Sequence, residues 1–273
     1  MIIDTHVHIG LFESKDWSVN MSGETVLKSM ELYGIDFALV SNLVVEYDCD
    51  LNPVPEELQI GQEEAFLEAI AFARQNKGKI GILPWIKPTT ETASEAFEKL
   101  LAENLDVVYG LKVHPYHSKI AFDSPQVEEY IKLAQKYNLP VMTHTANMDE
   151  ASPVRVYNMA KKYPDVKFIM AHMGLGTDNQ EAIELLGKAP NLYGDTTWVP
   201  LESTVQAVKL YGSKRIFFGS DSPIDGVDTY KYNREGGLSL YQRYFHELEG
   251  IIGTENYENI MYKNAMEVFG IKL

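Results

Sequence analysis

The chain is poor in cysteine, since Cys49 is the only one among its 273 residues. A single thiol cannot form an internal disulfide, which excludes a small disulfide-stapled framework and is typical of proteins from a reducing compartment. A chain of this length can bury a sufficient apolar core without such bonds. We therefore expect a cytoplasmic protein that is stabilised by its core.

Long apolar segments are also missing. No run approaches the roughly 20 apolar residues that a helix needs to cross a bilayer. The N-terminal sequence MIIDTHVH has neither the basic stretch nor the apolar stretch of a signal peptide. We expect neither a signal peptide nor a membrane partner.

Positive charge is scarce: 24 lysines and arginines face 39 aspartates and glutamates, which gives a net charge of −15. Such a charge repels phosphate backbones and anionic lipid surfaces, so nucleic acid is not an expected partner. A local basic pocket for one small anion is compatible with this balance. The expected partner is a small-molecule substrate, and the composition leaves homo-oligomerisation open.

Eight short apolar runs recur along the chain, with helical periodicity between them. We expect strands at residues 1–5, 37–42, 80–85, 108–114, 140–145, 166–172, 191–197 and 215–221. We expect helices at residues 63–76, 92–103, 124–137, 153–163 and 204–211, and a final packing helix at 256–269. Alternating strands and helices form parallel βα units, and eight units fit a closed (β/α)8 TIM barrel better than an open sheet. With no linker or repeat, residues 1–273 are predicted to form one domain, with long connections at 10–23 and 222–237.

Polar residues recur at the carboxyl ends of the predicted strands, where barrel enzymes carry their chemistry. His6 and His8 share one face of the first strand, because side chains alternate along a strand. The other strand ends contribute Lys112, His114, His144, His172 and Asp221. A lone histidine at a strand end is usually structural, but ligand-type residues on several independent strands point to a shared site. Imidazole and carboxylate groups suit zinc, and also manganese, iron or nickel.

These residues lie in motifs that resemble the amidohydrolase superfamily, in its amidohydrolase-related (type 2) branch. The resemblance is carried, in chain order, by DTHVH (4–8), GLKVHP (110–115), His144, AHMG (171–174), NLYGDT (191–196), FGSDSP (218–223) and NAMEVFG (264–270). It covers essentially the whole chain, and the ordered set is more specific than any single motif.

The resemblance implies a divalent cation, zinc first, held by His6, His8, His144 and Asp221. The cation would activate a water molecule, and Asp221 would take the water proton and return it to the leaving group. By the same resemblance, His172 either polarises the substrate carbonyl or binds a second metal. Lys112 would bridge two cations only if it is carboxylated or neutral, because an ammonium group beside a dication is unfavourable. Otherwise Lys112 pairs with a substrate carboxylate or a nearby acid.

Substrate contacts are expected from the ends of the strands and the loops that follow them. The principal candidates are Lys112, His114, Arg155 and Trp198, and further loop candidates are Trp85, Tyr116, Tyr230 and Arg234. Arg155 can grip a carboxylate or phosphate, or it can pair with a surface acid at a helix start. Asp4 can orient a metal-binding histidine, or it can cap a loop at the barrel floor.

The leading hypothesis is hydrolysis of an amide, lactone or ester bond in a small carboxylated substrate. The alternative is a metal-dependent non-oxidative decarboxylase, since the same branch contains such enzymes with similar ligands. A metal-dependent deoxyribonuclease is disfavoured by the acidic charge and by lysine at position 112. A non-catalytic barrel that only stores metal is disfavoured by the complete set of ligand residues.

Overall fold

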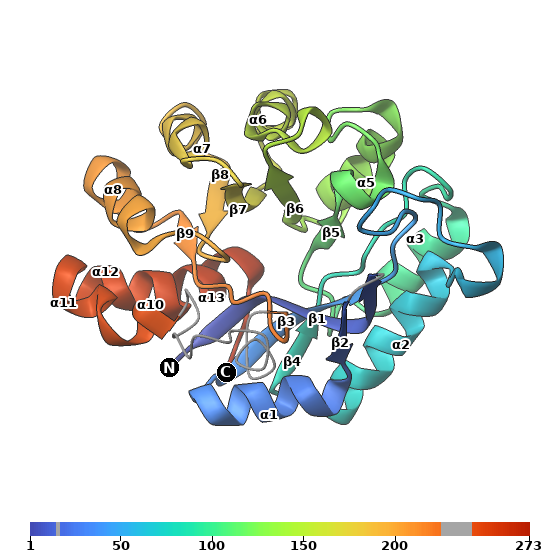
Figure 1. Cartoon of the computed structure of the whole chain (residues 1–273), viewed down its shortest axis with the longest axis horizontal. Coiled ribbons are helices and arrows are strands. Elements are labelled where there is room, and N and C mark those ends of the chain that lie inside the picture. The colour runs from blue at the N-terminus through green and yellow to red at the C-terminus, as the bar shows by residue number, and fades with distance from the viewer. Residues whose placement is uncertain (15–16, 225–241) are drawn as a thin grey trace.

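In the computed structural model, residues 1–14, 17–224 and 242–273 are described. Within these residues, eight strands run parallel around a ring, and helices cover the ring from outside (Figure 1). The strands are β1 (Ile3–Ser14), β3 (Phe37–Leu43), β4 (Ile80–Ile82), β5 (Leu111–Val113), β6 (Val141–Ala146), β7 (Phe168–Leu175), β8 (Leu192–Asp195) and β9 (Ile216–Phe217).

Two sheets make up the ring, with strand orders β2-β1-β3-β4, in which β2 is Trp17–Met21, and β5-β6-β7-β8-β9. At one seam, Ile82 and Val108 form a parallel bridge beside β5. At the other seam, the amide of Thr5 donates to the carbonyl of Phe218 at 3.0 Å. These contacts join both pairs of sheet edges, and the predicted (β/α)8 TIM barrel is confirmed.

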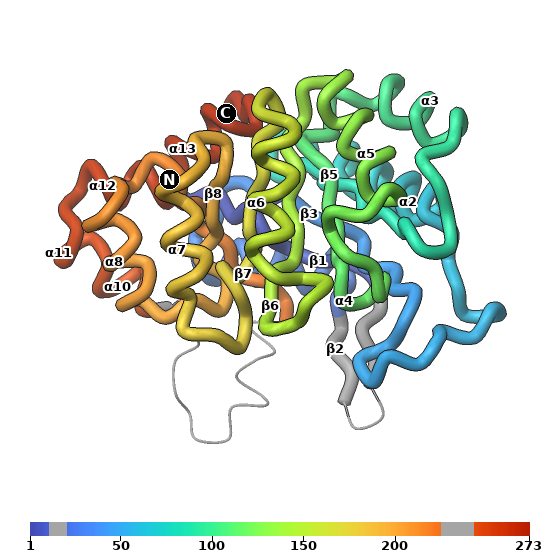
Figure 2. The backbone as a smooth tube through the Cα atoms, turned by 90° about the horizontal axis from the view of Figure 1, so that it is seen from above, coloured from blue at the N-terminus to red at the C-terminus, as the bar shows by residue number. Residues whose placement is uncertain are grey.

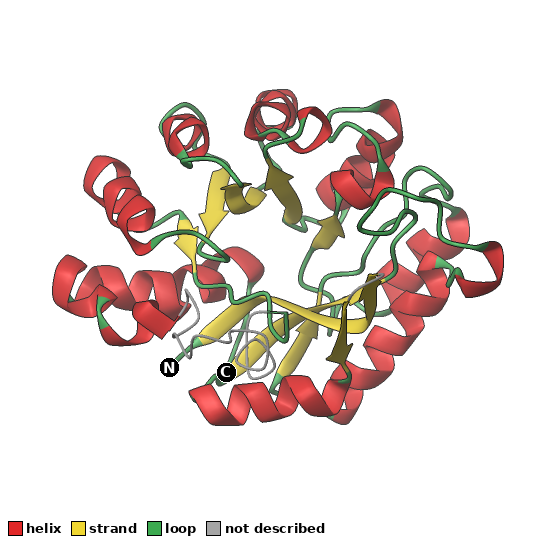
Figure 3. Cartoon of the chain, in the orientation of Figure 1, coloured by secondary structure: helices red, strands yellow, loops and turns green. Residues whose placement is uncertain are grey.

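The helices form the outer layer of the barrel (Figure 3). The longer ones are α1 (Gly23–Tyr33), α2 (Gln62–Gln75), α3 (Glu95–Glu103), α5 (Pro125–Lys136), α6 (Pro153–Lys162), α7 (Gln180–Leu186) and α8 (Leu201–Tyr211). Short turns follow β3, β5 and β6: η1 (Glu56–Leu58), α4 (Pro115–Ser118) and η2 (Asp149–Ala151). In the part of the chain that the structure describes, no helix has the length and apolarity to cross a membrane.

Side-chain alternation separates two apolar layers. Met142 packs inside the ring and Val141 packs against the helices. Because side chains alternate along a strand, His144 shares the inner face of β6 with Met142 and stands at its carboxyl end. Apolar side chains such as Met142 and Leu39 fill much of the ring below this level. Figure 2 shows both chain termini on the side away from α4.

Two expected segments differ from the structure. The predicted connection at 10–23 is largely a hairpin, because β1 continues to Ser14 and pairs antiparallel with β2. The predicted final helix at 256–269 is divided into α12 (Thr254–Glu258), a π-helical turn η3 (Asn259–Lys263) and α13 (Asn264–Phe269). A single π-helical turn inserts one residue into the ladder, and apolar periodicity does not reveal it. Two short helices, α10 (Gln242–His246) and α11 (Leu248–Ile252), precede these segments.

Candidate metal centre

A cavity of about 690 Å³ opens at the carboxyl ends of the strands. Its lining includes six of the seven histidines together with Asp221, Trp198 and Tyr116. Apolar side chains form much of the remaining wall: Leu43, Ala146, Met148, Leu175 and Ile224. Most of the polar strand ends predicted from the sequence therefore meet in one cavity, whose remaining wall is mainly apolar.

Three of the predicted metal ligands converge most closely. Nitrogen atoms of His6 and His8 and a carboxylate oxygen of Asp221 lie within 4.8 Å of one another, and all three residues are buried. Asp221 Oδ1 is 3.1 Å from His8 Nε2 and 3.4 Å from His6 Nε2. Two imidazole nitrogens and one carboxylate oxygen are a suitable donor set for a divalent transition metal. These residues fit the cation that the sequence predicts.

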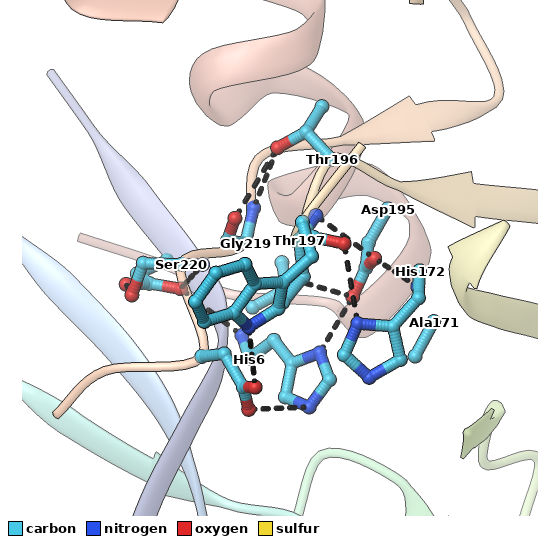
Figure 4. A network of polar contacts seen from close by, with 12 residues as sticks. His6, Ala171, His172, Asp195, Thr196, Thr197, Gly219 and Ser220 are labelled. Atoms are coloured by element: carbon cyan, nitrogen blue, oxygen red, sulfur yellow. Dashed lines mark hydrogen bonds and ion pairs between the residues drawn. The ribbon is translucent and has the colours of Figure 1, made fainter. Parts of the chain in front are cut away.

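Asp195 fixes the orientation of His6 (Figure 4). Its Oδ2 lies 2.7 Å from His6 Nδ1, so the proton of His6 sits on Nδ1 and the lone pair of Nε2 faces the other ligands. Carboxylate partners of this kind orient metal-binding histidines. Sequence reasoning assigned no role to Asp195, although it lies in the NLYGDT motif, because β1 and β8 are far apart in the sequence.

His172 reaches the cavity through an unusual backbone conformation. Ala171 faces the inside of the ring, so regular alternation would turn His172 outward. Instead His172 has a φ of +66°, and its amide donates to Asp195 Oδ1 at 2.8 Å. Such a φ is costly for a residue with a β-carbon and is concentrated at functional sites. The same carboxylate therefore holds both His6 and His172.

The hydrogen bonds of His172 also define its proton. Nδ1 lies 3.2 Å from the carbonyl oxygen of Thr197, which can only accept, so Nδ1 carries the proton and Nε2 a lone pair. Burial lowers the pKa of His172 to about 4, and the charge of Asp221 only partly opposes this. His172 is therefore neutral near pH 7.

Lys112 is fully buried beneath these residues, with its Nζ 2.7 Å from His6 Nε2. Burial lowers the pKa of Lys112 to about 8, while Asp195 and Asp221 oppose the shift. The amine thus contacts Nε2 of His6, the same nitrogen that would bind a cation. Binding of a cation there requires Lys112 to move, to lose its proton or to be carboxylated.

His144 lies beside the close triad rather than within it. Its ring is 4.7 Å from that of His172 and is stacked on His114 at 4.0 Å. Trp85 also stacks on His114, with 5.2 Å between the ring centroids. The predicted ligand His144 and the predicted substrate contact His114 both line the cavity.

Trp198 contacts a predicted ligand directly, because its Nε1–H donates to Asp221 Oδ2 at 2.8 Å. Oδ1 of Asp221 therefore faces the two histidines and Oδ2 faces the indole. Burial would raise the pKa of Asp221, but His6, His8 and His172 outweigh it and hold the pKa well below its usual range. Asp221 is a carboxylate at neutral pH.

Arg155 is not among the residues that line the cavity. Its Nη1 donates to Asp123 Oδ1 at 2.7 Å, and its Nη2 pairs with Asp149. This placement fits the expectation of a helix-start arginine paired with acids, and not that of a substrate contact. Two other candidates, Tyr230 and Arg234, lie outside the described residues.

The Asp4 carboxylate accepts hydrogen bonds from backbone amides and not from an imidazole. Its Oδ1 accepts the amides of His6 and Ser220, and its Oδ2 accepts the Ser220 hydroxyl. Burial raises the pKa of Asp4 to about 7, although these hydrogen bonds oppose the shift. Asp4 thus ties β1 to the segment that carries Asp221.

The comparisons with known proteins decide the family. An amidohydrolase family model matches residues 3–271, nearly the whole chain. The chain belongs to the amidohydrolase family. Members of this family are metal-dependent enzymes. The chain is therefore an amidohydrolase-type enzyme, as the sequence motifs predicted. No curated protein matches the chain.

Solved structures share the fold of this amidohydrolase at low sequence identity. A probable 2-pyrone-4,6-dicarboxylic acid hydrolase from Acinetobacter baumannii has a TM-score of 0.64 at 13% identity, over 99% of both chains. A 5-carboxyvanillate decarboxylase from Novosphingobium aromaticivorans, solved with bound manganese, has a TM-score of 0.70 at 11% identity, over 99% of this chain and 97% of its own. An uncharacterized TIM-barrel protein from Bordetella bronchiseptica has a TM-score of 0.69 at 18% identity, over 98% of both chains.

Proposed function

We propose that the chain is a metal-dependent hydrolase that cleaves an amide, lactone or ester bond of a small carboxylated molecule. The observation that carries the proposal is the convergence of His6, His8 and Asp221 within 4.8 Å at the cavity. With His144, they would hold one divalent cation, zinc in the first place. Manganese is the next candidate, because it is bound in the N. aromaticivorans decarboxylase. The cation would supply Lewis acidity, which polarises an oxygen atom of water or substrate.

The surrounding residues have defined tasks in this proposal. Asp195 keeps the proton of His6 on Nδ1, so the Nε2 lone pair would be available to the cation. Asp221 Oδ1 takes the proton of the attacking water and delivers it to the leaving group, while Trp198 holds Oδ2. Because its Nε2 carries a lone pair, His172 is better suited to act as a base or a metal ligand than to donate a hydrogen bond to the substrate carbonyl.

Lys112 determines the number of cations. An unmodified Lys112 competes for His6 Nε2 and leaves one cation per chain, whereas a carboxylated Lys112 would bridge two. We propose one cation, because in the structure Nζ contacts His6 directly. Neither nucleic acid nor a membrane is a proposed partner. Cytoplasmic location and homo-oligomerisation stay predictions.

Decarboxylation is the second candidate, favoured by the names of several structural neighbours, which are decarboxylases of 2,6-dihydroxybenzoate and 5-carboxyvanillate. Both reactions use the same cation donors, so only the product separates them. The test is an assay of the metal-loaded protein on lactones, esters and amides of carboxylic acids and, in parallel, on aromatic and dienoic acids. Hydrolysis products support the first proposal and released carbon dioxide supports the second. If both panels fail after metal reconstitution, both proposals are wrong.

A further inference from the structure

His114 has a hydrogen bond that fixes the position of its proton. It stands directly after β5 and precedes α4, and its Nδ1 accepts the backbone N–H of His117 at 3.3 Å. A ring nitrogen that accepts a hydrogen bond carries no proton. A neutral imidazole then has its proton on Nε2, which makes Nε2 a donor.

The amide that fixes His114 is itself held in place. The backbone carbonyl of His117 accepts a hydrogen bond from the amide of Tyr47 at 3.0 Å. The side-chain Nδ1 of His117 lies 2.8 Å from the carbonyl oxygen of Tyr47. The hydroxyl of Tyr116 donates to the carbonyl of Cys49 at 2.8 Å. Short segment α4 is therefore fastened to the loop after β3, and the N–H of His117 cannot easily turn away from His114.

The ring of His114 also stacks on two other rings. The angle between its plane and that of Trp85 is 23°, and the angle to the plane of His144 is 17°. Tilting the imidazole out of this plane would break both stacks. His114 is partly exposed and lines the cavity, so its edge is accessible to a substrate.

His172, on another side of His144, has the opposite proton arrangement. Its Nδ1 donates to the carbonyl of Thr197, so its Nε2 offers a lone pair. The two imidazoles that contact His144 thus differ: one offers a proton and the other accepts one. Among the described residues that line the cavity there is no lysine or arginine, so no such side chain competes with His114 for a substrate oxygen.

We infer that His114 is a specificity-determining residue, which donates Nε2–H to an oxygen acceptor of the substrate. The substrate class is a small molecule with one reacting group near His6, His8 and Asp221 and a second oxygen, in a carbonyl or carboxylate, at His114. The inference rests on the proposed function for the location of the reacting group. It does not depend on whether the bond that breaks is hydrolysed or decarboxylated.

The test is nitrogen NMR of the full chain, labelled with ¹⁵N-histidine and supplied with zinc, with the His114 signals assigned through a His114→Gln variant. The expected spectrum has the proton of His114 on Nε2. The probes are benzoate, 2,6-dihydroxybenzoate and 2-pyrone-4,6-dicarboxylate, and we expect at least one of them to shift the Nε2 signal. A proton on Nδ1, or a Nε2 signal that none of the three probes moves, overturns the inference.

Binding of the responding probe to two variants provides a second measurement. His114→Leu removes the donor and should weaken binding about 10-fold, as expected for one lost hydrogen bond. His114→Gln restores an N–H donor at a similar reach and should stay within about 3-fold of wild type. His246→Gln, which changes an exposed histidine of α10, is the matched control.

The inference and the proposed reaction can fail separately. Probes that move the His114 signal without any turnover leave the inference intact and contradict the reaction. Turnover with equal binding by wild type and His114→Leu contradicts the inference and leaves the reaction intact.

Discussion

Asp195 accepts the Nδ1–H of His6 at 2.7 Å, so a buried carboxylate on β8 determines which nitrogen a histidine on β1 offers to a cation. The same carboxylate accepts the amide of His172. One residue therefore organises both a predicted metal ligand, His6, and the neighbouring His172.

Replacement of Asp195 by asparagine should weaken metal binding. The amide side chain of the variant is uncharged and stabilises the orientation of His6 less well, and loss of such a partner typically costs about 10- to 100-fold in metal affinity. The measurement is competition for zinc with a chromophoric chelator. Asp178→Asn, which changes an exposed acid between β7 and α7, is the control. Equal zinc affinities for wild type and Asp195→Asn would show that Asp195 is only structural.

Replacement of Lys112 by methionine distinguishes one cation from two. If Lys112 is an unmodified amine at His6 Nε2, its removal should strengthen binding of a single zinc ion at pH 7 by about 10-fold, the equivalent of about 1.4 kcal/mol. Zinc titration followed by elemental analysis gives both the affinity and the stoichiometry. A fall from two zinc ions to one would instead identify Lys112 as a bridging carbamate.

Loss of the indole donor should change the pH dependence of the reaction. In Trp198→Phe the carboxylate loses the hydrogen bond to Oδ2, which raises the pKa of Asp221 because the charged form is stabilised less. We expect the acid limb of the kcat/KM profile to move to higher pH and kcat to fall about 10-fold. An unchanged acid limb would show that Trp198 does not affect the protonation of Asp221 in the reaction.

Acid should destabilise the fold through its buried neutral histidines. Burial lowers the pKa of His117 from 6.5 to about 4, so between these pH values the unfolded chain binds more protons than the folded protein. Stability is therefore lost as pH falls from about 6.5 to about 4. In His117→Asn, whose amide can still donate to Tyr47, the loss should be smaller by about 1–3 kcal/mol. Urea unfolding of the metal-free proteins at several pH values measures the difference, and parallel curves for the two proteins would refute it.

The sequence was sufficient for the barrel and for the order of its strands, although β1 runs to Ser14 and does not end at residue 5. Strand alternation and the position of each polar residue at a carboxyl end depend on local order, and His6, His8 and Asp221 meet as those patterns predict. The role of Asp195 could not be predicted, because it depends on the packing of β8 against the ring centre. The inward turn of His172 depends on a positive φ that its sequence context does not reveal.

The ion-pair partners of Arg155 could not be predicted from the sequence either. Its place after the fifth predicted strand was compatible with a substrate contact or with a surface ion pair, and its partners Asp123 and Asp149 approach it only in the folded chain. A cationic side chain near a predicted site is informative only when its acidic partners are known.

The metal content of the purified protein tests the central claim most directly. Elemental analysis after reconstitution should find a divalent metal in the wild type, little in His6→Ala, and most of it retained in Asp221→Asn, with activity lost in both variants. A wild-type protein that binds no divalent metal after reconstitution would contradict the account.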